Sequence, residues 1–297
     1  MKSIITPPLL LLCGLMTMAA AAPPAVSIEP HPHNPPDQNQ YLAFMAKAPW
    51  LDGYIRVRFP ENINSKLGLH FLDNLQPELP RVSKVALPEW QTDPGTGALF
   101  YQVQTAEGIG FAGRVRVEGE VIHMEYTVTN GTKEVQDLTS QVCFDMAPAK
   151  GLNERITLDH TFTWIGGEYR SLATTTSPKR EAKLAKNGFN WLLMLYNEQA
   201  DDPMRKIEDE CFWWIVDQKP DLPLMVRETA DRKHLVAITW ERSAVRRLMT
   251  NTNIPCLHAD PLECKDLPPG ESRSWRGRIF MMENSPSKLL DAFQKPQ

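Results

Sequence analysis

The chain has 297 residues and a formal net charge of −4 at pH 7, from 32 lysines and arginines against 36 aspartates and glutamates. Because both signs are interspersed along the sequence, the charge pattern argues against nucleic acid as a partner. The 25 prolines are spread widely, which favours short strands and loops over long helices.

The N-terminus has the pattern of an export signal. Residues 1–22 contain one lysine, an apolar run and a closing series of alanines, as secretory signal peptides do. The apolar run is too short and too interrupted by proline for a membrane span, and no other segment approaches that length. We therefore predict an exported protein, periplasmic or extracellular, without a membrane span. Residues 23–40 are rich in proline and polar side chains and predict a linker, followed by a single domain over residues 41–297.

Most of that domain has the alternation typical of β-strands. Residues 54–59, YIRVRF, alternate strictly and predict a half-buried strand. Residues 112–145 predict three successive strands, with the Asn130-Gly131 pair as a tight hairpin turn. Residues 177–188 and the segment that follows Ser285-Pro286 predict short helices. Because strands and helices do not alternate, the pattern predicts an all-β fold, a large antiparallel β-sandwich with one or two short helices.

Residues 251–270 concentrate chemically active side chains. The prolines of this stretch disfavour a helix, so we predict an ordered loop that leans on the sandwich. In an extended segment, Cys256, His258 and Asp260 point the same way, and we expect His258 and Asp260 to face a polar pocket. A disulfide between Cys256 and Cys264 is the favoured interpretation of the thiols, since an exported protein can form one.

Two alternatives for this loop stay open. A thiol, an imidazole and a carboxylate suit a soft divalent metal, but their spacing matches no standard zinc signature, so we expect no metal. His258 could instead serve only as a hydrogen-bonding anchor of the loop. The sequence also lacks the glycine-rich motifs of nucleotide cofactors and the G-x-S-x-G motif of serine hydrolases, so we expect no cofactor.

Candidate binding residues lie on the predicted strands. Alternation sends Trp213 and Trp214 to opposite faces, and Trp214 is a candidate for stacking on a sugar ring, with core packing as the alternative. His123, Glu125 and Gln141 share the outward faces of neighbouring strands and could line a polar patch on a concave sheet. An ordinary solvated sheet face is the alternative interpretation.

One segment resembles a known group of proteins. EVIHMEYTVTNGT, followed by LTSQVCFDM, is similar to the central hairpin of the galactose-mutarotase-like sugar-binding β-sandwiches, and the closing LPPGESRSWRGRIF resembles their last strand. This resemblance implies a mutarotase-like sandwich and a sugar-associated function. A catalytic histidine of the aldose epimerases matches Gln141 here, and glutamine cannot donate the proton that ring opening requires. The resemblance therefore speaks against mutarotase activity.

The leading hypothesis is an exported β-sandwich that recognises a carbohydrate or a related polyol, as a non-catalytic or accessory protein. The first alternative is a carbohydrate-active enzyme, either a polysaccharide lyase or a glycoside hydrolase, that uses His258, Asp260 and a contribution from His123. In a lyase, Arg227 and Arg278 could neutralise the uronate. A structural or protein-binding role is the third hypothesis, and no positive sequence feature supports it.

Overall fold

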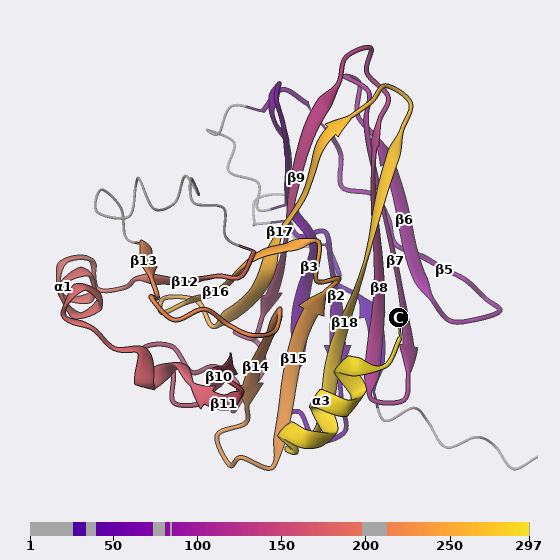
Figure 1. Cartoon of the computed structure of the whole chain (residues 1–297). Coiled ribbons are helices and arrows are strands. Elements are labelled where there is room, and N and C mark those ends of the chain that lie inside the picture. The colour runs from indigo at the N-terminus through magenta and orange to yellow at the C-terminus, as the bar shows by residue number, and fades with distance from the viewer. Residues whose placement is uncertain (1–25, 34–39, 74–80, 84, 198–212, 297) are drawn as a thin grey trace, which may run out of the picture.

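The computed structural model contains two sheets that pack face to face, which confirms the predicted antiparallel β-sandwich (Figure 1). The structure describes residues 26–33, 40–73, 81–83, 85–197 and 213–296, with the backbone alone at 260 and 261.

The first sheet has nine strands within the described residues. In spatial order these are β1 (Ser27–Pro30), β2 (Ala43–Lys47), β3 (Ile55–Ser65), β9 (Gln136–Asp145), β17 (Cys256–Leu267), β16 (Val245–Asn251), β12 (Trp191–Leu195) and β13 (Trp213–Ile215), while β4 (Gly68–Leu72) pairs with β3. Strands β12 and β13 run parallel, and the other pairs of this sheet are antiparallel.

In the part of the chain that the structure describes, the second sheet also has nine strands, and its pairs are all antiparallel. In spatial order these are β11 (Glu168–Ser171), β10 (Thr161–Ile165), β14 (Leu224–Glu228), β15 (His234–Trp240), β18 (Ser272–Glu283), β8 (Val121–Asn130), β7 (Ile109–Glu118), β6 (Leu99–Gln104) and β5 (Gln91–Thr92).

The two predicted helices are present and begin and end as their sequences indicate. The Ser177 side chain caps the first, which ends at Gly188 with a positive φ of 73°, and Ser285 caps the second. None of the helices in the described ranges is long and apolar enough to cross a membrane. Among the described residues, the helical segments are the 3₁₀ turn η1 (Leu172–Thr175), α1 (Pro178–Asn187) and α3 (Pro286–Gln294).

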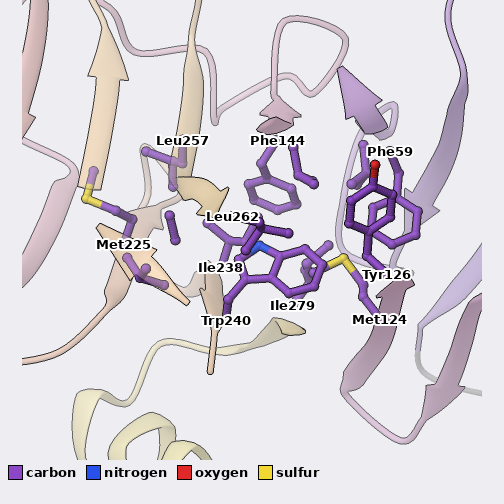
Figure 2. Close-up of a cluster of buried hydrophobic side chains, with 14 of the residues drawn as sticks. Phe59, Met124, Tyr126, Phe144, Met225, Ile238, Trp240, Leu257, Leu262 and Ile279 are labelled. Carbon is purple, nitrogen blue, oxygen red and sulfur yellow. The ribbon is translucent and has the colours of Figure 1, made fainter. Parts of the chain in front are cut away.

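The main core lies between the two sheets. Strand β8 supplies Ile122, Met124, Tyr126 and Val128 from alternate positions, and each is at most 2% exposed. Figure 2 shows Met124 and Tyr126 among side chains of the facing sheet, such as Phe144. The predicted period-two pattern of β8 therefore has a direct physical cause, because every second side chain is removed from water.

The predicted hairpin turn at Asn130-Gly131 is wrong. Strand β8 belongs to the second sheet and β9 to the first, so the chain crosses the sandwich between them. The Asn130 amide donates to the carbonyls of Glu134 and Leu267, both at 2.8 Å. These contacts fix the connection that leads from β8 to β9 in the other sheet. Between the two sheets, the Ser140 hydroxyl of β9 donates to the Tyr126 hydroxyl of β8 at 3.1 Å.

The predicted loop around His258 is a strand. Strand β17 lies in the middle of the first sheet, between β9 and β16. The register against β9 shifts between Leu257 and Leu262. A proline at residue 261 falls inside this shift, which is where a sheet tolerates the loss of a backbone donor.

The folded part also begins before Tyr41, inside the predicted linker. Strand β1 pairs with β2, and Val26 is 1% exposed in the main core. His31 is 6% exposed and its Nδ1 lies 2.8 Å from the Pro32 carbonyl oxygen. The proline-rich composition here is compatible with an edge strand because an edge needs fewer backbone donors.

Helix α3 covers part of the outer face of the second sheet (Figure 1). Its Leu289 and Phe293 pack with Phe280 and Met282 of β18 and with apolar residues of β10, β14 and β15. Beyond α3, the outer faces of β18, β8, β7 and β6 present polar side chains. This boundary between the covered and the polar part of the sheet positions the candidate site.

Candidate binding site

A pocket of about 230 Å³ lies on the outer face of the second sheet, over three adjacent strands. Strand β7 contributes two arginines, β8 a histidine and a glutamate, and β18 two further arginines. The polar residues of this arginine pocket are Arg114, Arg116, His123, Glu125, Arg276 and Arg278, and Met124 and Gly277 complete its lining.

Strand register aligns these side chains in two rows. Glu125 of β8 is paired with Arg114 of β7 on one side and with Arg276 of β18 on the other. One row further along, His123 lies between Arg116 and Arg278 in the same way. Directly paired residues of adjacent strands bring their side chains within about 5 Å at Cβ. The sheet therefore holds four guanidinium groups around one carboxylate and one imidazole.

Acidic residues outside the pocket partly balance two of the arginines. Arg114 donates to Asp93 at 2.8 Å, and this bond is the largest of the effects that lower the pKa of Asp93 to about 2. Arg116 donates to Glu118 at 2.8 Å. Arg114 and Arg116 are themselves exposed, so solvent screens both pairs and a ligand can reach both guanidinium groups.

Arg276 and Arg278 differ in their surroundings. Arg276 is exposed, and its guanidinium has no hydrogen bond or ion pair with any residue that the structure describes. Arg278 is 4% exposed and donates to the carbonyls of Ala292, Phe293 and Lys295 at 3.0, 2.6 and 3.2 Å. Arg278 thus binds the unpaired carbonyls at the end of α3 and fixes the helix at the edge of the pocket.

The surroundings of His123 lower the pKa of its imidazole and so favour the neutral form. Burial is the main cause that lowers its pKa, and the positive charges of Arg116 and Arg278 act in the same direction. The carboxylate of Glu118, 3.6 Å from Nε2, opposes them. A neutral imidazole offers one donor and one acceptor to a ligand, and an anion bound beside it would raise its pKa.

A second hollow of about 410 Å³ adjoins the arginine pocket and shares Arg114 and Glu125 with it. Its floor includes the ring of Phe100, which is half-buried on β6 and lies 5.9 Å from the Arg114 guanidinium. Thr127 lines it as well, and the Thr127 hydroxyl is 2.7 Å from that of Ser274. Guanidinium groups, hydroxyls and an aromatic ring therefore lie side by side on one rigid sheet.

The arrangement suits an anion that also carries hydroxyl groups. Guanidinium groups bind carboxylate, sulfate and phosphate through paired N–H donors. Four guanidinium groups face the carboxylate of Glu125 inside the pocket and those of Asp93 and Glu118 beside it, so the site keeps a net positive charge. Three of the side chains predicted for binding or catalysis, His123, Glu125 and Arg278, meet here.

Two other predicted binding residues do not contribute to this pocket. Gln141 lies on β9 of the first sheet and accepts a hydrogen bond from the side chain of Asn62. Trp214 is 4% exposed and belongs to the main core, so its predicted role in stacking on a sugar is wrong and the core-packing alternative holds. Its neighbour Trp213 packs edge-on against Trp191.

The predicted binding role of Arg227 is also wrong. Its side chain is 0% exposed and lies inside the sandwich. Nη1 donates to the carbonyls of Leu152 and Glu154 at 3.0 and 2.8 Å. Burial lowers its pKa to about 10. Arg227 therefore holds the segment around residue 153 to the sheet.

The site predicted for an enzyme, with His258 and Asp260 near His123 and Arg278, does not form. His258 lies on the first sheet, is 3% exposed, and places Nε2 3.2 Å from the Cys256 thiol sulfur. Arg278 and His123 lie on the second sheet. For Asp260, the backbone pairs with Arg247 of β16, and its side chain lies outside the described part of the chain.

The predicted Cys256–Cys264 disulfide is wrong. Both thiols are free. Cys256 is paired with Asp145 and Cys264 with Leu138, at opposite ends of β9. Eight residues of strand separate their Cα atoms by roughly 25 Å, whereas a disulfide needs about 6 Å.

Sequence reasoning missed Arg114, Arg116 and Arg276. A signal for them was present, because GRVRV and RGR each place two arginines two residues apart on a predicted strand. In a strand, such a pair projects from one face. What the sequence lacked was the order of the strands, which brings the two pairs to either side of His123 and Glu125.

No protein-family model matches the chain, and no curated protein does. Similar solved structures include the Slr1438 protein from Synechocystis sp. PCC 6803, with 10% identity and a TM-score of 0.44 over 87% of this chain and 92% of that one. A galactose mutarotase-like protein from Clostridium acetobutylicum has 10% identity and a TM-score of 0.37 over 66% and 65% of the two chains. A polysaccharide lyase has 12% identity and a TM-score of 0.40 over 91% of this chain and 34% of the lyase. At these identities and TM-scores, the similarities assign neither a family nor an activity to this chain.

Proposed function

We propose that this protein recognises an acidic saccharide, or a related polyol acid, at the arginine pocket. The observation that carries the proposal is the convergence of four guanidinium groups from β7 and β18 on both sides of His123 and Glu125. Arg114, Arg116 and Arg276 are exposed to a ligand, while Arg278 is held by the end of α3. Such a concentration of positive charge on a sheet surface is repulsive on its own, and a bound anion would relieve the repulsion.

The surroundings of the pocket favour a sugar acid over a simple inorganic ion. A carboxylate can bind Arg276 and Arg116, while sugar hydroxyls can bind Glu125 and the hydroxyl of Thr127. The half-buried ring of Phe100 offers an apolar plane of the kind on which sugar rings pack. An inorganic anion would use the arginines alone and leave this adjoining hollow empty.

Binding without hydrolysis agrees with the composition of the pocket. Glycoside hydrolysis usually requires two carboxyl groups on either side of the scissile bond. Glu125 is the single carboxylate among the described residues that line the arginine pocket. We therefore propose recognition, and not hydrolysis, as its role.

A second candidate is β-elimination from a uronate, favoured by the neutral His123 beside Arg116 and Arg278. A lyase needs a base for the proton next to the carboxylate and positive charge to neutralise that carboxylate. Turnover would create a new double bond that absorbs in the ultraviolet. Binding of a uronic acid polymer without any rise in absorbance excludes the lyase and leaves the binding function.

We further propose that the protein acts outside the cytoplasm, on the basis of the signal-like residues 1–22. Cell fractionation, with sequencing of the mature N-terminus, tests this. We expect a chain in the exported fraction that starts shortly after the alanine series. An intact N-terminus in the cytoplasm contradicts it.

The experiment that tests the proposed function is a calorimetric screen of the purified chain against neutral and acidic saccharides. We expect uronic acid or sulfated oligosaccharides to bind and neutral oligosaccharides of the same size to bind weakly or not at all. Affinity should fall with added salt because the pocket is at the surface and its charges are screened. Absence of binding to every acidic saccharide would refute the proposal.

A further inference from the structure

A second cluster of reactive side chains lies on the opposite side of the molecule from the arginine pocket. Cys143 of β9 and Cys256 and His258 of β17 bring their sulfur and nitrogen atoms within 4.8 Å of one another. They are 3%, 1% and 3% exposed. Two thiols and an imidazole form a ligand set that zinc and other thiophilic metal ions prefer.

The sheet itself creates this arrangement. Cys256 is paired with Asp145 across the two strands, and Cys143 lies two residues before Asp145 on the same face. Their sequence neighbours Phe144 and Leu257 are 0% exposed and point into the main core. The cluster therefore projects from the outer face of the first sheet. Residues 113 positions apart in sequence meet, which explains why the spacing within β17 alone matched no zinc signature.

The distances are close to those that a metal ion would impose. Two thiolates about 2.3 Å from a tetrahedral zinc lie roughly 3.8 Å apart, and a thiolate and an imidazole nitrogen lie roughly 3.6 Å apart. Nε2 of His258 is already 3.2 Å from the sulfur of Cys256. Because all three ligand atoms already lie within 4.8 Å of one another, small side-chain rotations would bring them to these distances.

A neighbouring residue donates a hydrogen bond to the sulfur of Cys256. The side-chain amide of Asn251, on β16, donates to the Cys256 sulfur at 2.8 Å. Donors of this kind orient a ligating thiolate and stabilise its charge. Zn²⁺ and two thiolates together carry no net charge, so the ion removes the cost of burying the thiolates.

We propose that Cys143, Cys256 and His258 form a binding site for Zn²⁺ or another thiophilic metal ion, contrary to our expectation from the sequence. The ion would join β9 to β17 on the outside of the sandwich. The site is independent of the arginine pocket, because it lies on the other sheet and shares no residue with it.

The test is titration of the reduced full chain with Zn²⁺, and with Co²⁺ as a spectroscopic probe. We expect one ion per chain, a thiolate-to-cobalt charge-transfer band in the near ultraviolet, and a higher Tm with Zn²⁺. Cys143→Ser and Cys256→Ser should each weaken the charge-transfer band and lower affinity by at least ~100-fold. Cys264→Ser is the matched control, since its thiol is on β17 but outside the cluster, and it should bind like the wild type.

X-ray absorption on the zinc-loaded wild type provides a measurement that does not depend on the folding of the variants. We expect sulfur scatterers at about 2.3 Å from zinc, accompanied by a nitrogen at about 2.0 Å. A shell of nitrogen and oxygen alone overturns the proposal. So does the absence of stoichiometric binding, or binding that survives both serine substitutions.

Discussion

Replacing Arg276 by glutamine tests the role of the arginine pocket with little risk to the fold. Arg276 is exposed, and its guanidinium has no hydrogen bond or ion pair within the described part of the chain. Glutamine keeps the length and polarity of the side chain but removes its charge. Arg276→Gln should therefore weaken binding of a uronic acid oligosaccharide while leaving the free energy of unfolding unchanged within about 0.5 kcal/mol.

The size of the effect follows from the exposure of the pocket. A hydrogen bond to a charged group contributes about 1.5–3 kcal/mol where water is excluded, and exposed ion pairs contribute at most about 1 kcal/mol. For this open site we expect about 1 kcal/mol, or about 5-fold in Kd. The double variant with Arg116→Gln should lose about 2 kcal/mol, or roughly 25-fold, because the two arginines lie on different strands.

The matched control is Arg273→Gln. Arg273 is an exposed arginine of the same strand, three residues before Arg276, and alternation places it on the opposite face. Calorimetry of both variants and the wild type, at one low and one high salt concentration, separates a local contact from the general charge of the protein. Equal losses for Arg273→Gln and Arg276→Gln would show that net charge, and not the pocket, attracts the ligand.

Three further results are expected. Because burial and nearby arginines lower the pKa of His123 and a bound anion raises it, affinity for an acidic saccharide should increase as pH falls from about 7 to about 5. In His123→Gln this pH dependence should disappear, and an unchanged pH dependence rejects the placement of His123 in the binding site. Arg227→Met removes the donor of two buried carbonyls and should destabilise the fold by about 3 kcal/mol in urea unfolding, whereas a loss below about 1 kcal/mol contradicts the structural role. Gly277→Ala places a Cβ 2.7 Å from the Trp240 ring and should lower the free energy of unfolding by about 1–3 kcal/mol. Gly95→Ala is the control and should change it little, because the nearest atom there is 3.4 Å away. Equal Tm values for the two variants refute this prediction.

The sequence predicted the sandwich because its strands alternate so regularly. In β8, every second residue from Ile122 to Val128 is buried, and the pattern alone identified the inward face. The starts of α1 and α3 could also be predicted from the sequence, since Ser177 and Ser285 each precede a proline. These features are local, and local chemistry determines them.

The pairing of the strands could not be predicted from the sequence, because it depends on contacts between residues that are distant in the chain. An Asn-Gly pair suits a hairpin turn, but here the Asn130 amide binds the Leu267 carbonyl and the chain crosses to the other sheet. Prolines suggested a loop around His258, yet a register shift accommodates Pro261 within β17. The candidate sites depend on the same strand order. His123 and Glu125 could be named from the sequence, while their arginine neighbours on β7 and β18 could not be assigned to them.

One comparison tests the central claim most directly, namely that the arginine pocket recognises the negative charge of a saccharide. The wild-type chain is titrated by calorimetry with a uronic acid oligosaccharide and with the methyl ester of the same oligosaccharide. The ester keeps the shape and hydroxyl groups of the sugar but removes its charge. We predict that the acid binds and that the ester binds at least ~10-fold more weakly, because its carboxyl groups no longer form charge-assisted bonds with the guanidinium groups. Equal affinity for the acid and the ester would contradict the proposed function.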